Sequence, residues 1–171
     1  MEAIRAIGGE GPVGVIATEA TVRAGAYAAA LSDACPGREI FSVPCPDFVP
    51  LIESGHIAKG DPAVAEAAER YLAPLRREGI GTLLLGCTHY GLIAPAIRAC
   101  LGENVRLLEA SVCAAEAVAE RLDRKQTCGV PGKLFCLTSG DAARFSSLAP
   151  LMLGEERVPE VCAMPPMEDK I

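Results

Sequence analysis

The chain has 171 residues, half of them apolar, 22% charged and only 4% aromatic, with no tryptophan. Its length suits one domain with a sizeable core, or one domain and part of a second, and its small aliphatic residues suit a helix-covered parallel sheet. The net charge of −6 with scattered basic residues argues against a nucleic-acid partner, and the lack of a long apolar run argues against a membrane partner, so we expect a cytoplasmic protein.

Eight cysteines are spread along the chain, at positions 35, 45, 87, 100, 113, 128, 136 and 162. None belongs to a Cys-x-x-Cys pair and no paired histidine spacing lies near them, so we expect no metal site. A disulfide framework is not expected either, because most of these cysteines lie in apolar runs of a chain without a leader. For every cysteine other than Cys87 we favour a structural position in the core.

The first part of the chain alternates apolar runs with helix signals. Residues 13–17 predict a strand, and the Ala-rich segment that follows Thr18 up to Leu31 predicts a capped turn and a helix. Residues 40–43 predict a second strand, which two prolines then stop, and residues 48–55 predict an apolar loop or one helical turn.

The alternation continues to the end of the chain. Asp61 and Pro62 are suited to a helix start, and the apolar spacing behind them predicts a helix up to Gly79. Strands that alternate with helices at this spacing predict an α/β fold with a parallel sheet and right-handed crossovers. The later elements expected are strand 80–85, helix 92–101, strand 105–108, helix 112–122 capped by Ser111, loop 125–133, strand 134–138, a helix after the turn at 139–141, and strand 158–163.

The segment 83–90 is the most informative stretch of the sequence. Three leucines and Gly86 end the buried strand, and Cys87, Thr88 and His89 follow at the turn into the next helix. In open parallel sheets, small ligands bind beyond the carboxyl ends of the strands, where helix N-termini direct N–H groups at anions. The same field lowers the pKa of a thiol, so Cys87 is the candidate reactive residue.

Hydroxyl groups follow two of the expected strands. Thr18 and Thr21 come after the first strand, and Thr88 follows the strand that ends at Leu85. Because the carboxyl ends of parallel strands meet at one edge of a sheet, these turns predict a carboxylate-binding wall beside Cys87. The alternative is that Thr18 and Thr88 only cap helices.

Four roles stay open for Cys87: nucleophile, metal ligand, general base and inert core thiol. A metal ligand needs partners that the spacing does not supply, and a nucleophile needs an imidazole oriented toward the sulfur. A general base needs a partly exposed thiolate near a helix end or a cation, with a hydrogen-bonding partner such as His89. A structural role for His89 carries equal weight, and we interpret His56 as structural or solvated.

Three ordered motifs with matching spacing carry a resemblance to a known family. They are residues 13–21, residues 45–53, and residues 86–90 after the triple leucine. Together they closely resemble the glutamate racemase family of the aspartate/glutamate racemase superfamily. Residues 134–141 and Phe145 are similar to the C-terminal region of that family, so the resemblance covers nearly the whole chain.

The resemblance implies an open parallel-sheet sandwich of the racemase type and an isomerase that uses no cofactor. Such enzymes interconvert L- and D-glutamate with two cysteines on opposite faces of the α-carbon, and they supply D-glutamate for peptidoglycan. By motif match, Cys87 is implied to be one of the two acid/base cysteines, with help from His89. Glu19 is implied to pair with His89, or else to serve as a first-turn helix charge. The substrate-binding residues that the resemblance implies are Thr18, Thr21, Thr88 and His89.

One departure from the family pattern affects the expected activity. The family's Cys-Asn-Thr motif, which supplies the first catalytic cysteine, does not occur in residues 1–171. We therefore expect residues 1–110 to form the second-cysteine domain and residues 111–171 to be a C-terminal segment that returns to a missing N-terminal domain. Because inversion needs an acid and a base on opposite faces, the chain alone is expected to be inactive.

Two other functional hypotheses stay open beside this one. The first is a racemase for aspartate or another acidic amino acid. The second is a non-catalytic remnant that binds glutamate or a partner protein. The resemblance also leaves a homodimer open.

Overall fold

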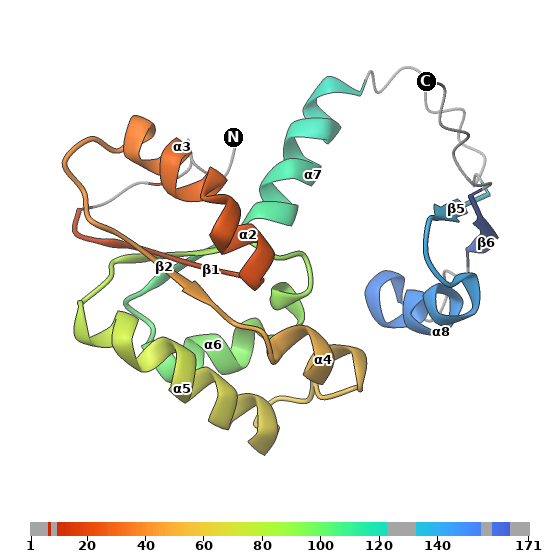
Figure 1. Cartoon of the computed structure of the whole chain (residues 1–171), viewed down its shortest axis with the longest axis horizontal. Coiled ribbons are helices and arrows are strands. Elements are labelled where there is room, and N and C mark those ends of the chain that lie inside the picture. The colour runs from red at the N-terminus through yellow and green to blue at the C-terminus, as the bar shows by residue number, and fades with distance from the viewer. Residues whose placement is uncertain (1–6, 8–9, 123–132, 155–158, 165–171) are drawn as a thin grey trace. The chain divides into compact units, whose positions relative to one another are not determined.

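Figure 1 shows the computed structural model of the chain, which describes residues 7, 10–122, 133–154 and 159–164. The chain divides into two compact units, residues 1–122 and residues 123–171. The expected domain division after residue 110 stays a prediction. None of the helices in the described ranges is long and apolar enough to cross a membrane.

A four-stranded parallel sheet forms the centre of the first unit. Its strand order is β2-β1-β3-β4 and every neighbouring pair is parallel, which confirms the parallel α/β sheet expected from the sequence. The two central strands are buried along their whole length, as their nearly continuous apolar runs predict. The strands are β1 (Val13–Ala17), β2 (Ile40–Pro44), β3 (Thr82–Leu85) and β4 (Arg106–Glu109).

Helices cover both faces of this sheet (Figure 1). They are α2 (Glu19–Ala24), α3 (Ala26–Ala34), α4 (Phe48–Glu53), α5 (Pro62–Arg77), the 3-10 helix η1 (Tyr90–Ile93), α6 (Ala94–Leu101) and α7 (Ala110–Arg121). On one face, Leu31 of α3 packs in a buried cluster with Val15 and Leu84 of the central strands. On the other face, a Cβ added at Gly14 would lie 2.8 Å from the Ile80 side chain and 2.9 Å from that of Leu83, so the glycine makes room for these two side chains.

The start of α5 follows directly from its sequence. Asp61 is the N-cap, and its carboxylate accepts hydrogen bonds from the backbone N–H groups of Ala63 (3.0 Å) and Val64 (3.2 Å). Pro62 occupies the first helical turn, where its missing N–H costs nothing. His56 Nδ1 lies 2.9 Å from Asp61 Oδ2, so this histidine has the structural contact that the sequence suggested.

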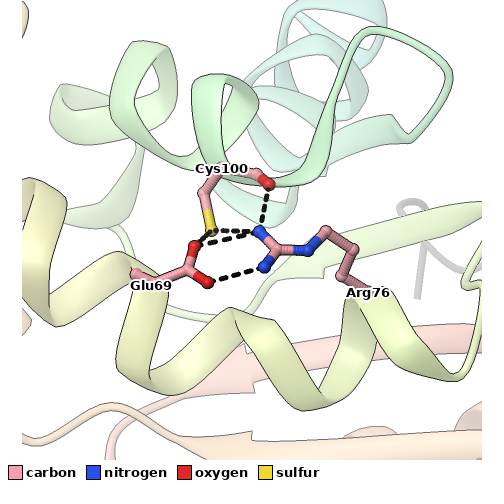
Figure 2. A network of polar contacts seen from close by, with 3 residues as sticks. All are labelled: Glu69, Arg76 and Cys100. Carbon is pink, nitrogen blue, oxygen red and sulfur yellow. Dashed lines mark hydrogen bonds and ion pairs between the residues drawn. The ribbon is translucent and has the colours of Figure 1, made fainter.

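A network of polar contacts connects α5 to α6 (Figure 2). It consists of Glu69, Arg76 and Cys100. The guanidinium of Arg76 donates to both carboxylate oxygens of Glu69, at 2.6 and 2.9 Å. It also donates to the Cys100 carbonyl at 2.9 Å, and the Cys100 thiol donates to Glu69 Oε2 at 3.3 Å. Cys100 therefore joins two helices, but it is only partly buried and does not lie in the core as expected.

The second unit is a strand-helix-strand segment. It consists of β5 (Phe135–Thr138), α8 (Ala142–Leu153) and β6 (Glu160–Ala163), and the two strands pair in parallel. Asp141 caps α8 by accepting from the N–H groups of Ala143 and Arg144, at 2.8 and 3.1 Å. Large apolar side chains of β5 are exposed, and the exposed fraction of Leu137 reaches 66%.

Several expected boundaries differ from the observed ones. The first predicted helix is divided into α2 and α3 by Gly25, whose φ of +68° is the left-handed conformation that favours glycine. Ser111 is not a cap, because α7 begins at Ala110 with Glu109 in the N-cap position. Residues 48–53 form a short helix, which is one of the two forms expected there. Most of the predicted loop 125–133, and the first residue of the predicted strand 158–163, lie outside the described residues.

Candidate active site

The site is built where the two central strands end. β1 and β3 are neighbours and run parallel, so Thr18 and Cys87 both follow carboxyl ends at one edge of the sheet. The Gly86 N–H donates to the Ile16 carbonyl at 2.8 Å and extends the ladder one residue past β3. A Cβ at Gly86 would lie 2.9 Å from a Tyr27 ring carbon, so only glycine lets the chain turn this close to α3.

The two threonine turns differ in what their hydroxyl groups do. Thr18 is the N-cap of α2, and its Oγ1 accepts from the Thr21 N–H at 3.4 Å and lies 2.9 Å from Thr21 Oγ1. Thr88 caps no helix, because η1 begins at Tyr90 with His89 in the N-cap position, and the Thr88 side chain is exposed. The capping interpretation therefore holds for Thr18 and fails for Thr88, whose hydroxyl is available to a ligand.

Cys87, His89 and Glu53 form a row of contacts that we call the triad. The Cys87 sulfur lies 3.9 Å from His89 Nδ1, and His89 Nε2 lies 3.3 Å from Glu53 Oε1. His89 and Glu53 are 25% and 20% exposed, so the pair is partly shielded from water. The imidazole thus stands between a thiol and a carboxylate, with one ring nitrogen toward each.

The carboxylate beside His89 is a different residue from the one expected. Glu19 lies in the first turn of α2 with an exposed side chain, and no contact of it with His89 is found among the described residues. In that position its charge faces the positive end of the helix dipole, which is the alternative interpretation given above. Instead, Glu53, the last residue of α4, lies beside the His89 imidazole.

Opposing influences act on the Cys87 thiol. Partial burial raises its pKa, because the thiolate loses hydration. Hydrogen bonds from the backbone N–H groups of His89 and Tyr90 lower the pKa, because both donors favour the anion. Burial outweighs these donors, so the pKa of Cys87 is raised above its ordinary value and the lowered pKa expected from the sequence is wrong. The turn after β3 does supply the N–H donors that were expected there.

A second thiol near this site has a different character. Cys45 is fully buried, and burial, with smaller contributions from Asp47 and Cys87, raises its pKa to about 12. It stays neutral at physiological pH and cannot act as a base there. Among the described residues, Cys87 is thus the thiol at this edge that combines partial exposure with donors for its anion.

The triad can perform proton transfer on a carbon acid. A thiolate at Cys87 can accept a proton, the His89 imidazole can exchange a proton with the sulfur, and the Glu53 carboxylate can stabilise the imidazolium. Exposed Thr88 and the Thr18–Thr21 turn offer hydroxyl groups at the same edge of the sheet.

Comparisons with known proteins agree with this fold. A family model described as Asp/Glu/Hydantoin racemase matches residues 1–118. A glutamate racemase of Desulforudis audaxviator is 40% identical over 95% of this chain and 63% of its own length. A glutamate racemase of Gloeobacter violaceus is 37% identical over 91% of this chain and 58% of its own length. The chain thus spans about three fifths of the length of these curated relatives.

Solved structures show the same similarity in three dimensions. A glutamate racemase of Bacillus anthracis matches with a TM-score of 0.82 and 27% identity over 96% of this chain and 62% of that one. A glutamate racemase of Francisella tularensis, solved in complex with D-glutamate, matches with a TM-score of 0.81 and 28% identity over 96% of this chain and 61% of that one. The expected racemase-type α/β fold is confirmed. With a family model that matches residues 1–118 and relatives about 40% identical over nearly its whole length, the chain belongs to the Asp/Glu/hydantoin racemase family.

Proposed function

We propose that this chain carries one acid/base half of a glutamate racemase, with Cys87 as the proton-transferring thiol. The observation that carries the proposal is the Cys87–His89–Glu53 triad at the carboxyl ends of β1 and β3. The names of the relatives support glutamate as the substrate, and one of the similar structures is a complex with D-glutamate.

The chemistry follows from the acidity of the groups involved. The α-proton of glutamate is far less acidic than a thiol, so its removal requires that the developing negative charge be stabilised. Cys87 accepts the α-proton as a thiolate, and the backbone N–H groups of His89 and Tyr90 offset part of the rise in its pKa that burial causes. His89, held by Glu53, delivers and receives the proton of the sulfur between turnovers.

Substrate binding is assigned to the hydroxyl groups at the same edge. Thr88 is exposed and caps no helix, so it is free to donate to a carboxylate of glutamate. Thr18 and Thr21 already bond to each other, and we assign them to the wall of the site. A catalytic role for Glu19, a homodimer and a cytoplasmic location stay predictions.

A full inversion needs an acid and a base on opposite faces of the α-carbon. Residues 1–171 contain no Cys-Asn-Thr motif, and Cys45 is too deeply buried to serve as the second base. We therefore propose that the 171-residue chain exchanges the α-proton from one face without inversion. In cells, we propose that the racemase reaction supplies D-glutamate for peptidoglycan.

The test is α-proton exchange in deuterium oxide. The purified chain is incubated separately with L-glutamate, D-glutamate and L-aspartate, and the α-proton signal is followed by NMR. We expect loss of the signal with a glutamate enantiomer and no loss with aspartate. Cys87→Ser is expected to abolish the exchange, whereas Cys100→Ser, which changes a thiol outside the site, is expected to preserve it.

Each other outcome has a defined meaning. Preferred exchange of aspartate would identify the chain with an aspartate racemase. A folded chain that binds glutamate without exchange would identify a binding module and overturn the proposed chemistry. Exchange that survives Cys87→Ser would show that another group is the base.

A further inference from the structure

Tyr90 connects the elements that carry the triad. It follows His89 directly, its side chain is completely buried, and its hydroxyl donates to the Cys45 carbonyl at 3.0 Å. Its ring meets the Phe48 ring edge to face, with 5.2 Å between the centroids and 87° between the planes.

The backbone and the ring of Tyr90 contact different parts of the site. The Tyr90 backbone N–H donates to the Cys87 carbonyl at 3.2 Å, which closes the turn that bears the thiol and the imidazole. Phe48 is the first residue of α4, and Glu53 is the last residue of the same helix.

Cys45 extends the connection to the first strand. Its backbone N–H donates to the Ala17 carbonyl at 2.9 Å, directly before Thr18. Tyr90 is therefore bonded or packed against the segments that carry Cys87 and His89, Glu53, and Thr18.

The hydroxyl has a task that a phenylalanine ring could not perform. A phenylalanine would fill the same volume, but it would leave the Cys45 carbonyl without this donor in a buried place. Burial, with smaller contributions from Cys45, Cys87 and Tyr71, raises the pKa of Tyr90, so the hydroxyl keeps its proton and remains a donor.

We propose that Tyr90 is a positioning residue, whose hydrogen bond to the Cys45 carbonyl holds the His89 imidazole between Cys87 and Glu53. The inference deepens the proposed function, since it concerns the geometry of the same triad. It predicts that the influence of His89 on the Cys87 thiol depends on the Tyr90 hydroxyl.

The test is a double-mutant cycle on the reactivity of Cys87. Alkylation of Cys87 by iodoacetamide is followed by mass spectrometry of its peptide, in the unchanged chain and in His89→Asn, Tyr90→Phe and the double variant. We expect His89→Asn to change the alkylation rate, and Tyr90→Phe to reduce that change by about threefold, near the low end of coupling between contacting residues.

Tyr71→Phe is the matched control. Tyr71 also packs edge to face on Phe48, with 5.4 Å between centroids, but its hydroxyl donates to Asp47 Oδ2 at 2.6 Å. The variant therefore removes a nearby tyrosine hydroxyl while the Tyr90–Cys45 bond stays, and the full effect of His89→Asn is expected to remain.

A reciprocal measurement requires no change at Tyr90. With tyrosine labelled at the carbon that bears the hydroxyl, Glu53→Gln is expected to shift the NMR signal of Tyr90 and to leave that of Tyr27 in place. This readout keeps the inference testable even if Tyr90→Phe does not fold, which far-UV circular dichroism would reveal.

Three results would overturn the inference: an undiminished effect of His89→Asn in the Tyr90→Phe background, an equal loss of that effect in Tyr71→Phe, or a Tyr90 signal indifferent to Glu53→Gln. Alkylation needs no substrate, so failure of the proposed function is a separate result. A chain that shows the coupling without exchanging the α-proton of glutamate would lack racemase chemistry but keep the positioning role of Tyr90.

Discussion

Cys87 and Cys100 are both partly buried thiols of the first unit, and each lies near a glutamate and a cationic or basic group, yet the hydrogen bonds at the two sulfurs have opposite effects on the thiol pKa. Burial raises the pKa of both. At Cys100, the thiol donates to the Glu69 carboxylate, which favours the neutral form, and the pKa rises to about 11. At Cys87, the backbone N–H groups of His89 and Tyr90 favour the thiolate and offset part of the effect of burial, although the pKa is still raised.

The difference shows that hydrogen bonds can add to the effect of burial on the pKa of one thiol and offset it at another. A carboxylate that accepts from a thiol keeps it protonated, whereas N–H donors prepare it to lose its proton. The two thiols also differ in their place in the fold. Cys100 fastens two helices together, while Cys87 follows a central strand at the edge where parallel sheets bind ligands.

The largest effect is expected from Glu69→Gln. It removes the negative charge beside the Cys100 thiol and leaves the Arg76 guanidinium, so the pKa of Cys100 falls from about 11. A fall of one unit makes alkylation of Cys100 about tenfold faster near pH 9, measured on its tryptic peptide. Glu66→Gln, an exposed position on the same helix, is the control and leaves the rate unchanged. An unchanged alkylation rate of Cys100 in Glu69→Gln would show that the Glu69 carboxylate does not keep this thiol protonated.

The opposite sign is expected when the glutamate of the triad is changed. Glu53→Gln removes the carboxylate that stabilises the His89 imidazolium, so the thiolate of Cys87 loses support. Alkylation of Cys87 near neutral pH is expected to slow by about threefold, within the range measured for coupled neighbours. If Glu53→Gln instead accelerated the reaction as Glu69→Gln does at Cys100, the two carboxylates would have the same role.

The smallest effect concerns stability in acid. The hydrogen bonds from the Arg76 guanidinium, and then the Cys100 thiol, lower the pKa of Glu69 from 4.5 to about 2. A lowered folded-state pKa stabilises the fold above pH 4.5, and this stabilisation is lost as the pH falls toward about 2. Because both side chains are about half exposed, the effect is small.

Urea unfolding measured across this acid range tests the prediction. The unchanged chain and Glu66→Gln are expected to lose stability more steeply than Glu69→Gln, which has no carboxylate to titrate at this position. Identical slopes in all three chains would show that the network contributes nothing measurable to acid stability.

Much of the site follows from the local sequence. The apolar runs 13–17 and 83–85 specify buried parallel strands, and such strands bring their carboxyl ends together, so Thr18 and Cys87 could be placed at one edge. Asp61 and Pro62 predicted the start of α5, because helix capping and a proline in the first turn are local properties of the sequence.

The remaining parts depend on tertiary packing. Glu53 closes a short apolar helix, and nothing in its local pattern shows that α4 turns this residue toward His89. Tyr90 bonds to a carbonyl 45 residues away, and Cys100 reaches Glu69 from another helix. Ser111 had the right chemistry for a cap, but the helix begins two residues earlier than expected, at Ala110. Contacts of this kind are set by how elements pack, which periodicity does not encode.

The measurement that tests the central claim most directly follows the alkylation of Cys87 and Cys100 in one sample, from about pH 6 to about pH 10, with and without glutamate. Trypsin cuts at Arg98, which lies between the two cysteines, so each thiol is reported by its own peptide. We predict that Cys87 reacts at lower pH than Cys100 and that glutamate slows the reaction of Cys87 alone. Equal pH dependence of the two thiols, or glutamate protection of Cys100 to the same extent as Cys87, would contradict the account.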